Sequence, residues 1–334
     1  MQLPKSYALE ITKSKIDLSV STNPLGCSPR VLKRLRRINL SDISKYPDPR
    51  LLKAAITKKF NISEDEIMFG GGSEQLIKLI TQTFLEKGNF TAVQKGSFFL
   101  FTKETLLKKG RVIFWDIGNF PTRNFPITLL FLANPATPTG TALTNIQIQE
   151  IINKFNPKIT VIDEANGEFW KESFINTNNF TQNVIVLRTF SKVLGLAGLR
   201  IAFACSNKIL IDKLKEVQQP FPVSEIAILA ATEALKDKQF ITKTIAFISE
   251  ERTLLNDELR RRGFKVSNSV TNNIFVETTN AGKIVTELKL RGVSVISGSF
   301  FPKNQLEGFR ISIKDKKTNR QFLNKLDEVL TCIK

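Results

Sequence analysis

The sequence contains no histidine, so the side chain that most often serves as a general base or metal ligand near neutral pH is missing. Any proton transfer must therefore use Lys, Asp, Glu or Tyr. The cysteines are only three, Cys27, Cys205 and Cys332, and they are widely separated. An odd number at such spacing argues against a disulfide or zinc framework and for a reducing compartment. We predict no metal site and a cytoplasmic location.

Long apolar runs are also missing. The longest, such as residues 127–133, are too short to span a bilayer, so we expect no membrane partner. The N-terminal stretch from Met1 to Tyr7 has no apolar segment behind its charges, and no signal peptide is expected.

Negative charge is scarce, because 49 Lys and Arg face 31 Asp and Glu and the formal net charge is +18. The basic residues are spread along the chain without aromatic residues interleaved. This pattern indicates a solvated basic surface rather than a nucleic-acid partner. Such a surface would also attract a phosphorylated substrate.

At 334 residues the chain is long enough for two domains. Strands expected near residues 91, 112, 129, 159, 184 and 200, separated mostly by helical stretches, predict an α/β fold with a doubly wound sheet. A long amphipathic helix over residues 240–262 leads into further alternating strands and helices. We expect an N-terminal arm at residues 1–35 that joins the small domain, a large domain at 36–240 and a small α+β domain at 241–334.

The most informative stretch follows a predicted buried strand at residues 183–188. It carries the hydroxyls of Thr189 and Ser191, then Lys192, two glycines and Arg200. A lysine just past a buried strand is well placed to lose its proton and form a Schiff base. Hydroxyls and a planar guanidinium are groups that bind phosphate.

This segment, Thr189-Phe-Ser-Lys-Val-Leu-Gly-Leu-Ala-Gly-Leu-Arg200, resembles the cofactor-lysine motif of pyridoxal-phosphate (PLP) aminotransferases of classes I and II. More narrowly, it is similar to the histidinol-phosphate aminotransferase branch. The resemblance implies the PLP-dependent transferase fold type I, with a large, mostly parallel sheet. It also implies that Lys192 holds PLP as a Schiff base and that Thr189, Ser191 and Arg200 hold its phosphate.

A second phosphate-binding segment is expected where a short strand is followed by three glycines and a helix. Glycines allow close approach of an anion, and a helix N-terminus offers free N–H groups. The family resemblance places the backbone of Gly72, Ser73 and Glu74 at the cofactor phosphate. An aromatic ring of the family lies flat on the cofactor ring. Of the candidates Phe98, Phe99 and Phe101, counting toward Gly110 favours Phe101.

Asp163 is expected at the carboxyl end of a buried strand, where the resemblance implies that it pairs with the protonated pyridine nitrogen. Two positions depart from the family pattern. Thr137 replaces the asparagine, and Asn166 the tyrosine, that usually donate hydrogen bonds to the ring oxygen. We interpret this as an exchange in which the Asn166 amide and the Thr137 hydroxyl share that role.

Three further residues complete the predicted site. Tyr46, in Tyr-Pro-Asp-Pro, is implied to reach the PLP phosphate of a neighbouring subunit, which requires a homodimer. Asn23, in Asn-Pro-Leu-Gly, is implied to contact substrate, and Arg310 to bind the substrate carboxylate. The second arginine that histidinol-phosphate aminotransferases carry after the preceding strand is absent, and Ser297 and Ser299 stand in that region.

These features predict a PLP-dependent transaminase of amino-acid biosynthesis. Its substrate would be a small amino acid or amine, including phosphorylated ones. The alternative is a decarboxylase of threonine phosphate or serine phosphate in cobamide biosynthesis, because the Asn-Pro-Leu-Gly and Tyr-Pro-Asp-Pro segments occur in that family too. A further alternative, motivated by Thr137 and Asn166, is a catalytically retired PLP-fold binding protein.

Overall fold

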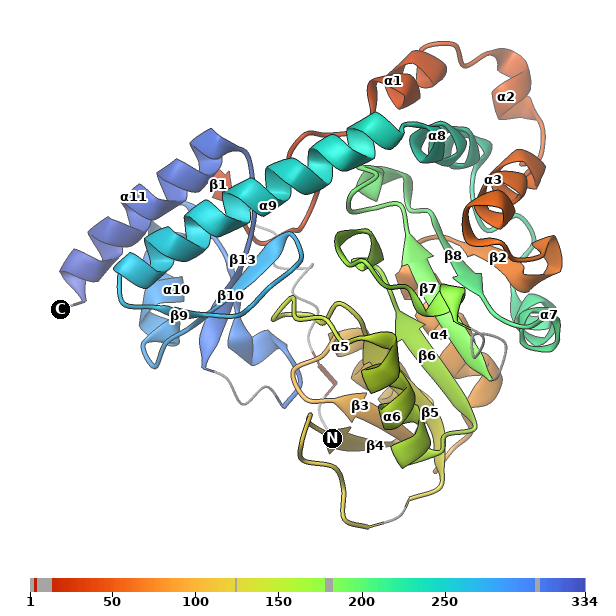
Figure 1. Cartoon of the computed structure of the whole chain (residues 1–334), viewed down its shortest axis with the longest axis horizontal. Helices are drawn as coiled ribbons and strands as arrows, with labels where there is room; N and C mark the ends of the chain where they lie inside the picture. Colours follow the sequence, from red (N-terminus) through yellow and green to blue (C-terminus); the bar gives the residue numbers. More distant parts are fainter. Residues whose placement is uncertain (1–2, 5–13, 124, 178–182, 304–306, 334) are drawn as a thin grey trace.

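The structure is a computed structural model that describes residues 3–4, 14–123, 125–177, 183–303 and 307–333. Most of the N-terminal stretch for which we predicted no signal peptide lies outside these residues. Figure 1 shows one large unit and one smaller unit joined by a long helix. Within the described part, no helix is long and apolar enough to cross a membrane.

The large unit is built on a seven-stranded sheet. In chain order its strands are β2 (Ile67–Gly70), β3 (Phe90–Gln94), β4 (Arg111–Trp115), β5 (Ile127–Ala133), β6 (Ile159–Asp163), β7 (Val184–Thr189) and β8 (Ala202–Cys205). Their order across the sheet is β2-β8-β7-β6-β5-β3-β4, and only β8 runs against its neighbours. The central strands are continuous apolar runs because both faces of the sheet are covered.

Two layers of helices cover this sheet. One face packs against α4 (Ser73–Phe84), α5 (Phe99–Leu107) and α7 (Lys208–Val217). The other packs against α1 (Pro29–Leu35), α3 (Arg50–Phe60), α6 (Asn145–Phe155) and α8 (Glu225–Lys236), with the short α2 (Leu40–Ser44) beside α8. The predicted doubly wound, mostly parallel sheet is confirmed, and the carboxyl ends of its parallel strands lie along one edge.

The smaller unit has its own sheet and core. Its four strands are β9 (Lys265–Val266), β10 (Asn273–Glu277), β12 (Ile296–Ser297) and β13 (Gly308–Ser312), in the order β12-β13-β10-β9. They pack against α9 (Lys238–Arg261), α10 (Ala281–Leu290) and α11 (Lys316–Cys332). In Figure 1, α9 runs from the large unit along the whole of the small one.

The N-terminal arm joins the small unit through a two-stranded sheet. There β1 (Ile16–Asp17) pairs in parallel with β11 (Val293–Ser294). Residues 293–297 form two short strands, β11 and β12, and not one continuous strand. The two halves have different partners, the arm for β11 and β13 for β12, so the chain changes direction between them.

Candidate active site

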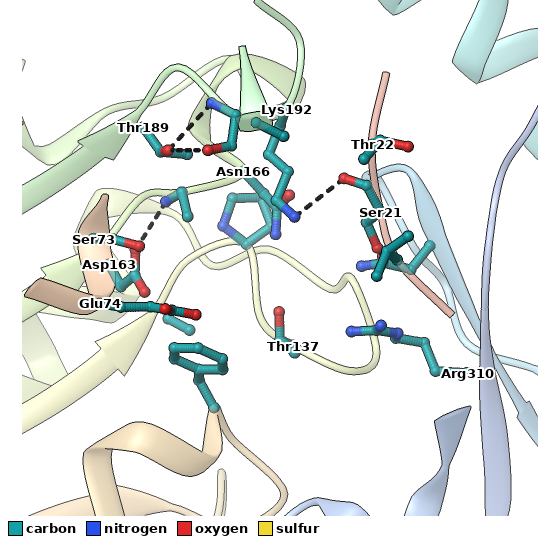
Figure 2. Close-up of a pocket in the computed structure, with 18 of the residues that line it drawn as sticks. Ser21, Thr22, Ser73, Glu74, Thr137, Asp163, Asn166, Thr189, Lys192 and Arg310 are labelled. Carbon is teal, nitrogen blue, oxygen red and sulfur yellow. Dashed lines mark hydrogen bonds between the residues drawn. The ribbon is translucent and has the colours of Figure 1, made fainter. Parts of the chain in front are cut away.

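A cavity of about 410 Å³ opens where the strand ends of the large sheet face the small unit and the arm. The residues that line it come from segments far apart in the sequence: Val20, Ser21, Thr22, Ser73, Glu74, Phe98, Ala133, Pro135, Thr137, Asp163, Ala165, Asn166, Thr189, Ser191, Lys192, Ala197, Arg200, Asn273 and Arg310. Figure 2 shows Lys192, Asn166, Thr137 and Arg310 arranged around this space. Most of the predicted site residues are therefore brought together.

Lys192 follows β7 and projects into the cavity (Figure 2), where its Nζ donates a hydrogen bond to the backbone oxygen of Ser21 at 3.1 Å. Burial is the main cause that lowers the pKa of Lys192 to about 8, followed by the positive charge of Arg310, while Asp163 opposes the shift. A lysine with this pKa releases its proton near neutral pH, which both Schiff-base formation and general base catalysis require.

Asp163 is the last residue of β6, as predicted, and its side chain is buried. Its Oδ1 accepts a hydrogen bond from the Ala165 backbone N–H at 3.0 Å. Burial raises the pKa of Asp163 to about 6, and the Ala165 hydrogen bond and the charge of Lys192 oppose that rise. The carboxylate needs a cationic partner, which a protonated pyridine nitrogen provides.

The anion-binding end of the cavity is formed by two strand-to-helix turns. Ser73 and Glu74 begin α4, and Thr189 donates to Ser191 Oγ at 2.9 Å just after β7. The Arg200 guanidinium lies 3.7 Å from Glu74 Oε2. These hydroxyls, helix N–H groups and guanidinium together match the donors that a phosphate requires.

Gly72 does not line the cavity, but it makes room for Arg200. Its φ is +87°, and a Cβ there would lie 2.5 Å from Arg200 Nη2. Glycine is therefore required both by the backbone conformation and by the close approach of the guanidinium.

The two positions that depart from the family pattern both line the cavity. Thr137 lies on the loop after β5 and Asn166 follows β6. The Oδ1 of Asn166 is buried and has no hydrogen-bond partner among the described residues. Buried polar atoms are normally paired, so this amide is available to a bound molecule.

Arg310 enters the cavity from β13 of the small unit. Its side chain is buried, and its Nη2 donates to the Ser19 backbone oxygen. The guanidinium also lies over the ring of Phe301, with 5.8 Å between Cζ and the ring centroid. A guanidinium held on two sides in this way is oriented for a planar anion such as a carboxylate. Ser297 and Ser299 hydrogen-bond to each other outside this cavity.

The structure contradicts the prediction for Phe101. Its ring is fully buried and stacks on Phe131 at a centroid distance of 4.6 Å, on the core side of α5. Phe98, which precedes the first turn of α5, lines the cavity instead. The three phenylalanines differ in their place relative to the helix start, and only Phe98 lies on the side of the strand ends.

Asn23 also lies outside the cavity. Its side chain is buried and Nδ2 donates to the backbone oxygen of Val193 at 2.7 Å, so it ties the arm to the loop that carries Lys192. Tyr46 is 79% exposed, away from the cavity, and stacks on Phe221 with ring centroids 4.3 Å apart.

Sequence reasoning considered Phe98 but did not favour it, and it missed other lining residues, among them Val20, Ser21, Thr22 and Asn273. Asn273 begins β10, and a polar residue at the start of a buried strand was a usable signal. The arm residues carry no such signal, because their position depends on tertiary contacts.

The sequence model of the family "aminotransferase class I and II" matches residues 13–326. The chain belongs to this family. A curated relative, histidinol-phosphate aminotransferase from Pelagibacter ubique (strain HTCC1062), is 32% identical over 336 residues that cover 94% of this chain and 92% of the relative. A second relative with the same description, from Clostridium botulinum (strain Okra / Type B1), is 31% identical and covers 95% of this chain and 93% of its own length.

Solved structures show the same fold. Histidinol-phosphate aminotransferase from Sinorhizobium meliloti, in complex with pyridoxal-5′-phosphate, superposes with a TM-score of 0.87 at 24% identity, covering 98% of this chain and 94% of that one. The predicted fold type I is thereby confirmed.

Aminotransferases of this family use PLP, and the residues present fit the cofactor. The cavity offers a lysine of lowered pKa, a buried carboxylate at a strand end and the unpartnered amide oxygen of Asn166. At its other end it offers the hydroxyls and guanidinium of a phosphate site. Lys192 would hold the aldehyde carbon, Asp163 the ring nitrogen, and Ser73, Thr189, Ser191 and Arg200 the phosphate.

Proposed function

We propose that this aminotransferase acts on histidinol phosphate, transferring its amino group to a 2-oxo acid, or, in the reverse direction, transferring the amino group of an amino acid donor to the corresponding ketone phosphate. The proposal is supported by the relatives, which carry that description at about 30% identity over most of the chain. The observation that carries it is the convergence of Lys192, Asp163 and Arg310 on one cavity. The basic surface, with a net charge of +18, favours encounter with a phosphorylated substrate.

In this proposal each side chain has one task. Bound PLP supplies an electron sink that acidifies the substrate C–H bond next to nitrogen. Asp163 keeps the pyridine nitrogen protonated, and Lys192 Nζ takes the proton from that substrate carbon and returns one during transfer. Arg310 binds the anionic group of the substrate, which is the phosphate of histidinol phosphate or the carboxylate of the donor.

Thr137 and Asn166 share the hydrogen bonds to the ring oxygen in this proposal. Both line the cavity, and each carries a hydrogen-bond donor that an ionised ring oxygen requires, the Thr137 hydroxyl and the Asn166 Nδ2. Because hydrogen bonds to the ring oxygen favour its ionised form, Thr137→Val and Asn166→Ala should each change the pH dependence of the bound cofactor's absorption. If neither variant shifts that pH dependence, the two residues do not share this role.

The proposed enzyme is a homodimer in which Tyr46 contacts the cofactor of the partner subunit. Tyr46 is exposed and held by Phe221 at the surface, which suits a residue that reaches another subunit. Tyr46→Phe should weaken PLP binding without dissociating the dimer. If Tyr46 does not contact the cofactor, the variant will bind PLP as tightly as wild type. Sedimentation and PLP titration measure the two effects separately.

Two further parts of the proposal concern organisation and location. Separate sheets and cores support a large domain at 36–240 and a small domain at 241–334. The proposed arm at 1–35 joins the small domain through β1, whereas α1 at its end packs on the large unit. A cytoplasmic location is supported by the three free cysteines, Cys27, Cys205 and Cys332.

A decarboxylase remains the second candidate. L-threonine-O-3-phosphate decarboxylase from Porphyromonas gingivalis shares the fold, with a TM-score of 0.81 at 22% identity over 95% of this chain and 99% of that one. The two reactions differ in which bond to the substrate carbon stands perpendicular to the cofactor ring, and the same residues serve either.

A single-turnover assay separates these candidates. PLP-loaded protein is mixed with glutamate, histidinol phosphate, threonine phosphate or serine phosphate, and the cofactor absorption and released carbon dioxide are followed together. Conversion of the cofactor to its amine form by glutamate and histidinol phosphate, without carbon dioxide, is the expected result. Carbon dioxide from threonine phosphate or serine phosphate would replace the proposal by the decarboxylase. Unchanged absorption with every compound would favour a retired enzyme.

A further inference from the structure

The arm segment at residues 19–22 borders the cavity, and three of its successive backbone oxygens accept hydrogen bonds from cations. The pairs are Arg310 Nη2 to Ser19, Lys314 Nζ to Val20 at 2.8 Å and Lys192 Nζ to Ser21 at 3.1 Å. Lys314 Nζ also donates to Thr22 Oγ1 at 3.2 Å. The backbone on both sides of Ser21 is therefore fixed by contacts that do not involve Lys192.

The Ser21 side chain is tied to the small unit. Its Oγ donates to Asn273 Oδ1 on β10 and hydrogen-bonds to Ser312 Oγ on β13 at 2.8 Å. Ser21 is itself buried. With its side chain held by the small sheet, its backbone oxygen faces Lys192, as Figure 2 shows.

The same oxygen has a second donor. The side chain of Asn272 is fully buried, and its Nδ2 lies 3.3 Å from Ser21 O. A carbonyl oxygen has two lone pairs, so Lys192 and Asn272 can both donate to it. The opposite orientation of the amide would place two oxygens against each other. The contact with Ser21 therefore fixes the orientation of the Asn272 amide, with Nδ2 toward Ser21. The buried Oδ1 of Asn272 has no partner within the described ranges.

We propose that Asn272 is a positioning residue for Lys192. Together with the contacts that anchor residues 19–22, it holds the Ser21 carbonyl as the resting acceptor for the Lys192 ammonium whenever that amine is not covalently bonded to the cofactor. The inference rests on the cofactor-binding role proposed above for Lys192 and adds to it a residue that never touches cofactor or substrate.

The physical reason lies in the charges around Lys192. Burial disfavours its ammonium form, and so do three cations, Arg310 on β13, Arg200 before β8 and Lys314 after β13. Asp163 on β6 favours the ammonium. A fixed carbonyl acceptor favours it as well, because the charged ammonium is a stronger hydrogen-bond donor than the neutral amine. Without that acceptor the released amine would lose its proton more readily and change its position.

The test measures Lys192 in the full-length apoprotein, where no cofactor contributes. Competitive labelling with acetic anhydride over a pH series, with the Lys192 peptide quantified by mass spectrometry, gives the apparent pKa of this amine. We expect Asn272→Ala to lower it by about 0.5 pH unit, less than the loss of a whole hydrogen bond, because the Ser21 acceptor is displaced and not removed. Asn272→Asp, which adds a negative charge at the same place, should raise it.

Ser206→Ala is the matched control. The Ser206 side chain is also fully buried and donates to a backbone oxygen, that of Val184 at 2.6 Å, at the opposite end of β7 from Lys192. It should lower the thermal stability without moving the Lys192 labelling curve. Circular dichroism checks that each variant is folded, and Asn272→Ala alone decides the question if Asn272→Asp does not fold.

The outcomes separate this inference from the proposed function. Labelling curves of the Asn272 variants that coincide with wild type would overturn the positioning role, even if their stability falls. Borohydride trapping of PLP on wild-type Lys192 tests the proposed function independently. With holoenzyme, Asn272→Ala should lower kcat more than it changes KM, since the substrate contacts are intact, and an effect on KM alone would contradict the inference.

Discussion

Arg188 Nη1 and Glu164 Oε2 form an ion pair at 2.7 Å, and both side chains are almost completely buried. A second carboxylate, Glu168, contacts Arg188 Nη2 at the same distance. Glu164 directly follows Asp163, and Arg188 directly precedes Thr189. This ion pair therefore joins the ends of β6 and β7 at the two points where they carry the proposed cofactor-binding residues Asp163 and Thr189.

Arg188→Ala should destabilise the protein strongly. It would leave two buried carboxylates without their cationic partner, and breaking a buried ion pair typically costs about 3–5 kcal/mol in the free energy of unfolding. Glu164 would keep only the hydrogen bonds from Ser173 Oγ and the Phe174 N–H. Urea denaturation of the apoprotein measures the loss. Arg50→Ala is the matched control, because Arg50 pairs with Asp48 at the surface, where solvent screening leaves an ion pair little effect on stability. Equal losses for the two variants would show that the buried pair has no special role.

Phe98→Leu and Phe101→Leu should have different effects, because Phe98 lines the cavity and Phe101 lies in the core. Replacing the Phe98 ring by the smaller leucine side chain is expected to weaken PLP retention with little loss in the free energy of unfolding. Phe101 is fully buried against Phe131, so its substitution should lower the free energy of unfolding by about 1–3 kcal/mol. PLP titration and urea denaturation of both variants make the comparison. Weaker PLP retention in Phe101→Leu alone would restore the prediction made from the sequence.

The fold was largely predictable from the sequence because strands buried on both faces of a parallel sheet are continuous runs of apolar residues. The runs that became β5, β6 and β7 place their following residues along one edge of the sheet, and this placed Asp163 and Lys192 together. Arg310 was recognised only through its family motif, since nothing local predicts that β13 faces the large sheet.

The errors came from tertiary arrangement. Phe98 and Phe101 have the same chemistry and lie three residues apart, so only the observed start of α5 at Phe99 distinguishes the cavity side from the core side. The contact of Lys192 with Ser21 joins residues 171 positions apart through a backbone oxygen, which carries no sequence signature. For the same reason Asn272 could not be recognised from its residue type.

Gly72→Ala tests the space that Arg200 needs. At Gly72, φ is +87° and a Cβ would lie 2.5 Å from Arg200 Nη2, whereas at Gly88, φ is +85° and no atom lies within 4 Å. Both positions have a positive φ, so both substitutions strain the backbone, and Gly72 with ψ at 162° is in a region that only glycine adopts readily. Only Gly72→Ala should displace the guanidinium, weakening PLP binding by about tenfold, the equivalent of one charge-assisted hydrogen bond. PLP titration of the two variants decides, and equal affinities would place Arg200 away from the cofactor phosphate.

Asp163→Asn should stabilise the apoprotein while impairing the holoenzyme. Burial raises the pKa of Asp163 from 3.8 to about 6 in the folded apoprotein, so between these values the folded state holds more protons than the unfolded state. Stability therefore falls as the pH rises through this window, and above it the ionised carboxylate costs on the order of 3 kcal/mol. The asparagine variant lacks this cost, so its free energy of unfolding should exceed that of wild type at about pH 8 and approach it at about pH 4.

PLP binding should change in the opposite direction: the Asp163→Asn variant should bind PLP more weakly than wild type, because a neutral amide cannot form an ion pair with a protonated pyridine nitrogen. Urea denaturation of both apoproteins at the two pH values, followed by PLP titration, measures the two effects on the same preparations. A variant less stable than wild type at about pH 8 would contradict the pKa argument. Unchanged PLP affinity would instead contradict the placement of the ring nitrogen at Asp163. The buried carboxylate is thus expected to lower the stability of the empty protein because its position is set for a cationic partner.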